Sequence, residues 1–301
     1  MSAFEIFSDG AADIPKEVAE KYHITIIPFY VSLDQKTYQK EIEELSLNLF
    51  YKKILEENIF PKTSLPSVQD YINAFTPALE AGKDILCFTI TDTLSGSFQS
   101  AVSAKEILKE NYPNAVIYIE NSWAATGSQY LLVREAARMA QSGYSLEQVH
   151  DYVEKTKKDS RIFFVIGTLA YLQKGGRIGK VASVSGSILN IKPLIVLKDG
   201  EINKAGVVRN RKKAMIKLSE LTKNYILQSH LDETDFVATI GITNDETEIA
   251  PFTKIIQKSL PNLPLLQPFQ IGATIATHTG PMTLGICIVK KFETYLKEYQ
   301  K

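Results

Sequence analysis

Residues 85–97 read Ile-Leu-Cys-Phe-Thr-Ile-Thr-Asp-Thr-Leu-Ser-Gly-Ser, and the fold follows from them. The first six are apolar or β-branched, which predicts a short strand buried on both faces. A hydroxyl-rich turn follows, and residues 98–110 then show the spacing of a helix. Strand, turn and helix in this order form the unit of a parallel sheet covered by helices.

The same alternation runs through the first half of the chain. It predicts further strands at residues 4–7, 24–31 and 115–119, and helices at residues 14–22, 47–57, 68–79 and 125–141. Asp13 followed by Pro15, and Ser67 followed by Asp70, have the spacing of helix N-termini. We therefore expect an α/β N-terminal domain, residues 1–158, with a parallel sheet and helices on both of its faces.

The second half has a different pattern. Strands are expected at residues 161–166, 193–197, 201–208, 236–242, 265–269 and 283–289. Asp199-Gly200 predicts a hairpin, because these residues readily adopt the positive φ angles of a tight turn. The polar stretch 157–160, after a helix expected at 146–155, suggests the domain boundary. We expect an α+β C-terminal domain, residues 159–301, with a mixed sheet.

Composition excludes several classes of function. The 301 residues contain 34 Lys plus Arg and 34 Asp plus Glu. This lack of basic excess argues against nucleic acid as a partner. No signal peptide or apolar run of about 20 residues is visible, so we expect a cytoplasmic protein. Cys87 and Cys287 lie in apolar runs and are expected to be buried free thiols.

Nucleotide and metal motifs are also missing. The stretch Lys174-Gly175-Gly176-Arg177-Ile178-Gly179-Lys180 is not a phosphate-binding loop, because only three residues separate Gly175 from Gly179 and Val181 follows the lysine. The sequence contains no HExxH, GxSxG or GxGxxG motif and no paired cysteines. We expect no cofactor and no metal site.

Two hydroxyl-rich loops and one histidine are the candidate ligand-binding elements. Ser95-Gly96-Ser97 stands where a strand ends and a helix begins, and such a turn suits an anion. Thr63-Ser64-Leu65-Pro66-Ser67 is either a similar site or a rigid turn that caps the next helix. His278, in a Thr/Gly/Pro loop, is either structural or a donor to a ligand. His23, His150 and His230 lie in polar contexts and are expected to face solvent.

Taken together and in order, these motifs resemble the DegV family, the fatty-acid-binding subunits of bacterial fatty acid kinase. The resemblance runs from residue 4 to about residue 290. It depends on Ser8-Asp9 with Asp13-Ile14-Pro15, Thr63-Ser64-Leu65-Pro66-Ser67, Ser95-Gly96-Ser97, Leu172-Gln173-Lys174-Gly175-Gly176-Arg177-Ile178, Leu189-Asn190-Ile191-Lys192-Pro193 and His278-Thr279-Gly280-Pro281.

The resemblance implies that a single long-chain fatty acid lies in a tunnel between the two domains. Its carboxylate would be held by Thr63, Ser95 and His278. The residues implied to support these loops are Ser64, Gly96, Ser97, Thr279 and Gly280. Hydroxyls with one histidine suit this role, because a buried carboxylate is costly unless it is hydrogen-bonded.

The resemblance also implies that catalysis lies in a partner. A separate kinase subunit would phosphorylate the bound carboxyl group, and the acyl-phosphate would feed phospholipid synthesis. Arg177 and Arg209 resemble the residues that dock this kinase, and neither lies in an apolar pattern, so both are expected to face solvent. Exchange of the lipid would involve transient contact with a membrane.

Two alternatives remain open at this point. Ser95 or Ser97 could pair with His278, oriented by a carboxylate such as Asp92, in an acyl hydrolase or transferase. The second alternative is a binder of a small polar ligand held through the histidine.

Overall fold

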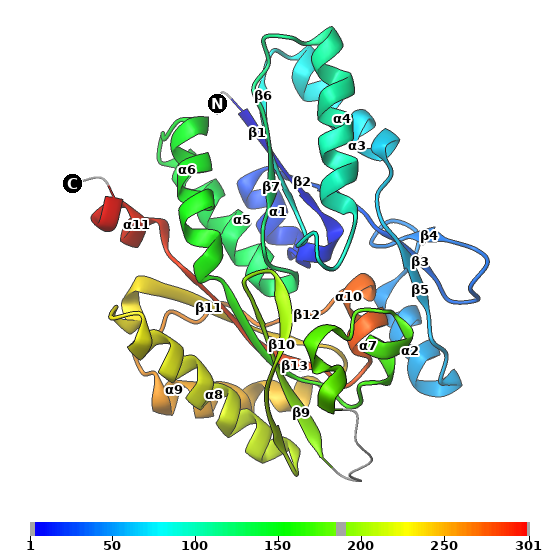
Figure 1. Cartoon of the computed structure of the whole chain (residues 1–301), viewed down its shortest axis with the longest axis vertical. Coiled ribbons are helices and arrows are strands. Elements are labelled where there is room, and N and C mark those ends of the chain that lie inside the picture. The colour runs from blue at the N-terminus through cyan, green and yellow to red at the C-terminus, as the bar shows by residue number, and fades with distance from the viewer. Residues whose placement is uncertain (1–3, 185–190, 300–301) are drawn as a thin grey trace.

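The computed structural model describes residues 4–184 and 191–299 (Figure 1). The first half of the chain forms a parallel sheet whose strands run in the order β2 (Ile24–Ile27), β1 (Phe4–Asp9), β6 (Asp84–Thr89) and β7 (Ile117–Asn121). The helices of this half are α1 (Lys16–Tyr22), α2 (Leu47–Glu57), α3 (Val68–Glu80), α4 (Ser97–Asn111), α5 (Thr126–Gln141) and α6 (Leu146–Thr156).

Both faces of the parallel sheet are buried. On β6, Leu86 and Phe88 pack with the apolar side chains of α5 and α6, whereas Ile85 and Cys87 pack with those of α3 and α4. This alternation explains why the strand is a continuous apolar run: successive side chains point to opposite faces, and helices cover each face. The predicted α/β class of the first half is confirmed.

The second sheet is mixed, as predicted. Its strands run in the order β10 (Glu201–Val208), β9 (Lys192–Lys198), β8 (Arg161–Val165), β13 (Leu284–Lys290), β11 (Phe236–Ile242) and β12 (Phe269–Gln270). Neighbouring strands are antiparallel except for β11 and β12, which are parallel. Asp199 and Gly200 have φ angles of 53° and 76° and join β9 to β10, so the predicted hairpin is confirmed.

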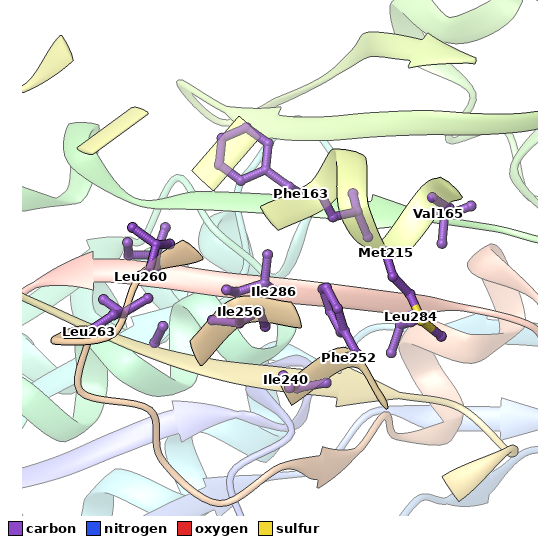
Figure 2. Packing of buried hydrophobic residues seen from close by; sticks show 14 of the residues in the cluster. Phe163, Val165, Met215, Ile240, Phe252, Ile256, Leu260, Leu263, Leu284 and Ile286 are labelled. Atoms are coloured by element: carbon purple, nitrogen blue, oxygen red, sulfur yellow. The ribbon is translucent and has the colours of Figure 1, made fainter. Parts of the chain in front are cut away.

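One face of this mixed sheet is covered by α8 (Arg211–Gln228) and α9 (Ile249–Ser259). Figure 2 shows Met215 of α8 and Phe252 of α9 among the strand side chains Phe163, Ile240 and Leu284. The opposite face carries other apolar side chains of the same strands. They point toward the first half of the molecule and form the core around the pocket described below.

The remaining elements of the described chain are a small third sheet, three short helices and several 3-10 turns. A small antiparallel sheet contains β4 (Gln39–Lys40), β3 (Tyr30–Ser32) and β5 (Lys62–Ser64). The other helices are α7 (Ala170–Lys174), α10 (Ala273–Thr279) and α11 (Phe292–Tyr299), with 3-10 turns η1 (Gly10–Ala12), η2 (Lys157–Asp159), η3 (Gly179–Val184), η4 (Glu233–Asp235) and η5 (Glu246–Glu248). The C-terminal helix α11 packs back against α5 and α6 (Figure 1). The division at residues 158 and 159 stays a prediction.

Two strand predictions were wrong in detail. The strand expected at residues 24–31 is split into β2 and β3, which belong to different sheets, and Pro28 lies in the gap. The strand expected at residues 265–269 is reduced to Phe269–Gln270, with Leu265 making one isolated bridge. Pro28 and Pro268 have no N–H to donate to a ladder, which explains both interruptions.

Candidate functional site

A largely apolar cavity of about 240 Å³ lies where the carboxyl end of the parallel sheet meets the inner face of the mixed sheet. Ile90 and Ala125, which follow β6 and β7, line one side. Ile162 and Phe164 of β8 line the other. A ligand site beyond the carboxyl ends of parallel strands is the usual arrangement in α/β sheets.

Among the polar side chains that line this largely apolar cavity, four come from separate elements and include the predicted head-group ligands. Thr63 belongs to β5, Ser95 to the turn before α4, His278 to α10, and Arg177 to the segment after α7. The Oγ1 atom of Thr63 lies 2.9 Å from Nε2 of His278. The structure therefore brings together the three residues that the sequence predicted as head-group ligands, and it adds a positive charge.

His278 is held in a confined position. Burial, followed by the positive charge of Arg177, lowers the pKa of its imidazole to about 4, so the ring is neutral at pH 7. Its Nδ1 atom is buried and has no hydrogen-bond partner among the described residues. This side of the ring faces Gly175, where a Cβ atom would collide with Nδ1. The absence of a side chain at residue 175 is thus what leaves room for the imidazole.

The turn that carries Ser95 is fixed by a buried network. Ser97 donates its hydroxyl to Oδ2 of Asp9 at 2.7 Å and lies 2.7 Å from the hydroxyl of Tyr71. Its N–H donates to Oγ of Ser95 at 3.2 Å. Asp9 also accepts the N–H of Ile90 at 2.9 Å, and burial raises its pKa to about 6. Ser97 therefore supports the turn, whereas Ser95 lines the cavity.

Arg177 lies differently from what the sequence suggested. It is partly buried rather than fully exposed, and it lines the cavity. Its Nε donates to the carbonyl of Leu94 at 3.0 Å and its Nη1 to that of Gly175 at 2.6 Å. The expectation that it faces solvent was wrong, because these two carbonyls hold the guanidinium against the pocket. Arg209, by contrast, is exposed and is not among the lining residues.

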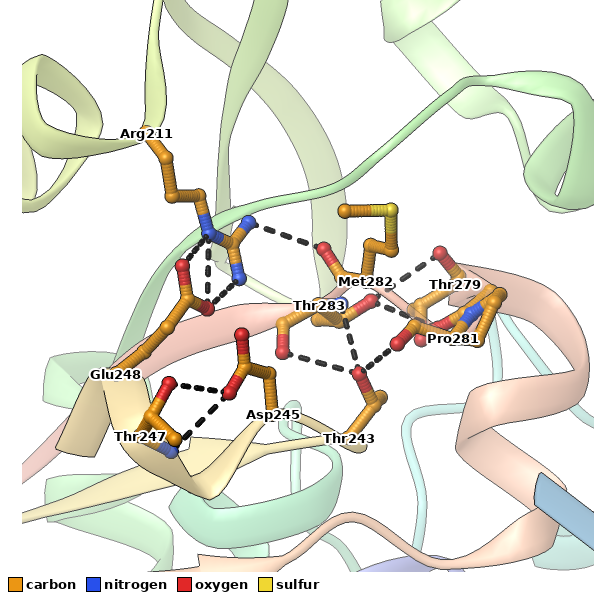
Figure 3. Close-up of polar contacts among 10 residues, drawn as sticks. Arg211, Thr243, Asp245, Thr247, Glu248, Thr279, Pro281, Met282 and Thr283 are labelled. Atoms are coloured by element: carbon orange, nitrogen blue, oxygen red, sulfur yellow. Dashed lines mark hydrogen bonds and ion pairs between the residues drawn. The ribbon is translucent and has the colours of Figure 1, made fainter. Parts of the chain in front are cut away.

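The segment after His278 is held by Thr243, which follows β11, and by Arg211, the first residue of α8 (Figure 3). Thr243 donates its hydroxyl to the carbonyl of Pro281 at 2.7 Å and accepts the N–H of Thr283 at 2.9 Å. Arg211 donates to the carbonyl of Met282 at 3.0 Å. These bonds hold the loop that directly follows α10, the helix that carries His278.

The other predicted supporting residues contact the same cavity or shape it. Ser64 and Thr279 line the cavity beside the polar cluster. Gly96 immediately precedes α4. Gly280 has a φ angle of 80°, and a Cβ atom there would lie 2.6 Å from the ring of Tyr171. Glycine is therefore required at this helix end for both conformation and space.

The model of a family described as "Uncharacterised protein, DegV family" matches residues 3–291. The chain belongs to the DegV family. A DegV domain-containing protein of Clostridium perfringens is 33% identical over 288 residues, which are 95% of this chain and 97% of that one. The Leu189-Asn190 part of one DegV motif lies outside the described residues, and Lys192-Pro193 begins β9.

Three solved structures are similar to this protein over nearly the whole chain. A stearic-acid-binding protein from Eubacterium ventriosum has a TM-score of 0.92 and 37% identity, covering 97% of this chain and 99% of that one. A fatty-acid-binding DegV family protein from Thermus thermophilus has a TM-score of 0.86 and 28% identity, covering 96% of this chain and 100% of that one. DegV of Bacillus subtilis, a fatty acid binding protein, has a TM-score of 0.83 and 28% identity, covering 97% and 100%.

The geometry of this DegV protein does not favour a serine hydrolase. Ser97 is bonded to Asp9, and Nε2 of His278 faces Thr63. Because Nδ1 of His278 lacks a partner in the part of the chain that the structure describes, no carboxylate there orients the ring as a catalytic base requires. Among the described residues, none of the helices has the length and apolar character needed to span a bilayer.

Proposed function

We propose that this protein binds one long-chain fatty acid, with the acyl chain in the apolar cavity and the carboxylate at Thr63, Ser95 and His278. The observation that carries the proposal is the cluster of polar groups in an otherwise largely apolar cavity. The fatty acid binding described for the three structurally similar proteins supports it. A small polar ligand would not offer an apolar surface for most of the side chains that line the cavity.

Burial of the acyl chain supplies most of the affinity in this proposal. Each buried CH₂ group contributes about 0.8 kcal/mol, and a long chain has more than a dozen of them. The cavity, at about 240 Å³, is smaller than most ligand pockets, whose volumes are roughly 300–1,000 Å³. We therefore expect the side chains that line the cavity to move apart when the acyl chain binds.

The polar cluster compensates for burial of the carboxylate. In the lipid-bound protein the carboxylate would replace the 2.9 Å contact between Thr63 and His278. The hydroxyls of Thr63 and Ser95 and the single N–H of the neutral His278 ring can then each donate one hydrogen bond to it. Arg177 adds a full positive charge at the wall. A carboxylate with three donors and a nearby cation can remain ionised in an apolar pocket.

We further propose that the bound carboxylate is presented to a separate kinase subunit, which forms the acyl-phosphate for phospholipid synthesis. Arg209, exposed directly after β10, and Arg177, at the pocket wall, would dock this partner. The test reconstitutes the loaded protein with a bacterial fatty acid kinase and ATP in the cytoplasmic pH range. The proposal is supported if acyl-phosphate forms only when this protein is added. It is overturned if no acyl-phosphate forms with the fatty-acid-loaded protein.

A further inference from the structure

Glu120, His150 and Glu154 bring three potential metal ligands together at the edge of the parallel sheet, away from the cavity. Glu120 belongs to the edge strand β7, and His150 and Glu154 lie one turn apart on α6. One ligand atom from each lies within 4.8 Å of the other two. Residues at i and i+4 share a face of a helix, so both α6 side chains point toward the strand.

The carboxylate of Glu120 is incompletely satisfied. The residue is only 1% exposed. Its Oε1 lies 2.5 Å from Nδ1 of His150, and its carboxyl group lies within hydrogen-bond reach of that of Glu154, whereas Oε2 receives no hydrogen bond from a donor among the residues described by the structure. Buried carboxylate oxygens are rarely left unpartnered, because the loss of hydration is costly. Two carboxyl groups in contact share either a proton or a cation, and the imidazole nitrogen that completes this cluster is a ligand for a cation.

The surroundings position the other two donors and leave a route from solvent. The ring of His150 stacks on Tyr118, with centroids 3.9 Å apart and an interplanar angle of 6°. The side chain of Glu154 is 45% exposed, so one wall of the cluster is open. Lys157 pairs with Glu154 and lies over the ring of Trp123, and it is the charge that an incoming cation would displace from the carboxylate.

We propose that Glu120, His150 and Glu154 form a Zn²⁺ site that ties β7 to α6. One imidazole nitrogen and two carboxylate oxygens are ligands that Zn²⁺ accepts, with water as the fourth. Tetrahedral ligands on zinc lie roughly 3.3 Å apart, given bonds of about 2.0–2.1 Å. The side chain of Glu154 is exposed and can move to bring its carboxylate oxygen from within 4.8 Å of the other ligand atoms to this distance. Mg²⁺ prefers six oxygen ligands and suits this set poorly.

The site was not recognisable in the sequence, because Glu120 is thirty positions from His150 and only the i, i+4 pair is local. The structure also corrects the expectation that His150 faces solvent, since the ring is partly buried between Tyr118 and Glu120. The proposed metal site does not depend on fatty acid binding, so the two proposals can fail separately.

The test treats the whole protein with a chelator, removes the chelator, and titrates ZnCl₂ in competition with a chromophoric zinc indicator. We expect one saturable Zn²⁺ per chain and weakening of about tenfold or more in Glu120→Gln, His150→Ala and Glu154→Gln. MgCl₂ should not displace the ion. Glu147→Gln on α6 and His230→Ala, both exposed, are matched controls that should bind as wild type.

A second readout distinguishes a metal site from a hydrogen-bonded cluster. At one fixed Zn²⁺ concentration, bound Zn²⁺ should raise the melting temperature of the wild type and both controls clearly more than that of His150→Ala or Glu154→Gln. The half-exposed Glu154 keeps the test valid if Glu120→Gln does not fold. The proposal is overturned if the wild type takes up no Zn²⁺, or if the site variants bind it like the controls.

Discussion

Thr63 and His278 are 215 positions apart in the chain, yet Oγ1 of the first lies 2.9 Å from Nε2 of the second. Thr63 comes from the small sheet of the first half and His278 from a helix near the C-terminus. Their contact joins two distant parts of the chain at the wall of the apolar cavity. The contact therefore places two polar side chains together at the point of the cavity wall where a fatty acid carboxylate would bind.

Thr63→Ala, Ser95→Ala and His278→Ala are each expected to weaken fatty acid binding by roughly ten- to a hundredfold. The reason is that a hydrogen bond to a charged group contributes about 1.5–3 kcal/mol. None should abolish binding, since the acyl chain remains buried. A displacement assay gives the affinities, and thermal melts check the fold. Wild-type affinity in all three variants would contradict the head-group assignment.

The unfolding free energy of the lipid-free protein should depend on pH through His278. Because its pKa is lowered from 6.5 to about 4, its contribution is fully present above pH 6.5 and is lost as the pH falls toward 4. Between pH 7.5 and pH 5.0 the wild type should lose about 2 kcal/mol more than His278→Gln.

Urea unfolding of both proteins at the two pH values measures this difference. Asp9, whose pKa is raised to about 6, acts with the opposite sign, since its contribution is lost as the pH rises through 6. It is present in both proteins and cancels in the comparison. Equal pH dependence of the two proteins would show that His278 is not held neutral.

Gly175→Ala should weaken fatty acid binding by displacing the imidazole of His278, with which its new Cβ would collide. The matched comparison is a double-mutant cycle. In a His278→Ala background the added methyl group no longer meets the ring, so Gly175→Ala should have little further effect on affinity. Additive losses in the double variant would instead indicate a general distortion of the loop.

Arg177→Ala and Arg209→Ala are expected to behave differently. Arg177 lines the cavity and bonds the carbonyls of Leu94 and Gly175, so its removal should weaken both fatty acid binding and acyl-phosphate formation. Arg209 is exposed, so its removal should spare binding and lower only kinase turnover, because interface arginines are frequent hot spots. Unchanged turnover in Arg209→Ala would remove it from the docking surface.

The sequence predicted the elements whose local pattern is strong. The run from Ile85 to Ile90 showed a buried strand, and Asp199-Gly200 showed the hairpin, because both signals lie within a few residues. The split at Pro28 was missed, since the apolar residues on both sides form one continuous pattern. Periodicity records which residues are buried, and it does not record which sheet they join.

The site was predicted through the family resemblance more than through chemistry that the sequence displays. The loops carrying Thr63, Ser95 and His278 were identified, and the structure places all three at one cavity. The location of Arg177 was missed because its partners are backbone carbonyls, one of them more than eighty positions away. A charged residue held by distant carbonyls leaves no local pattern.

Mass spectrometry of the purified protein tests the central claim most directly. The protein is expressed in bacteria, purified, denatured and extracted with organic solvent, and the lipid is quantified against the chain. We expect one long-chain fatty acid per chain, with less retained by His278→Ala. A lipid-free extract, together with no uptake of added fatty acid by the native protein, would contradict the account.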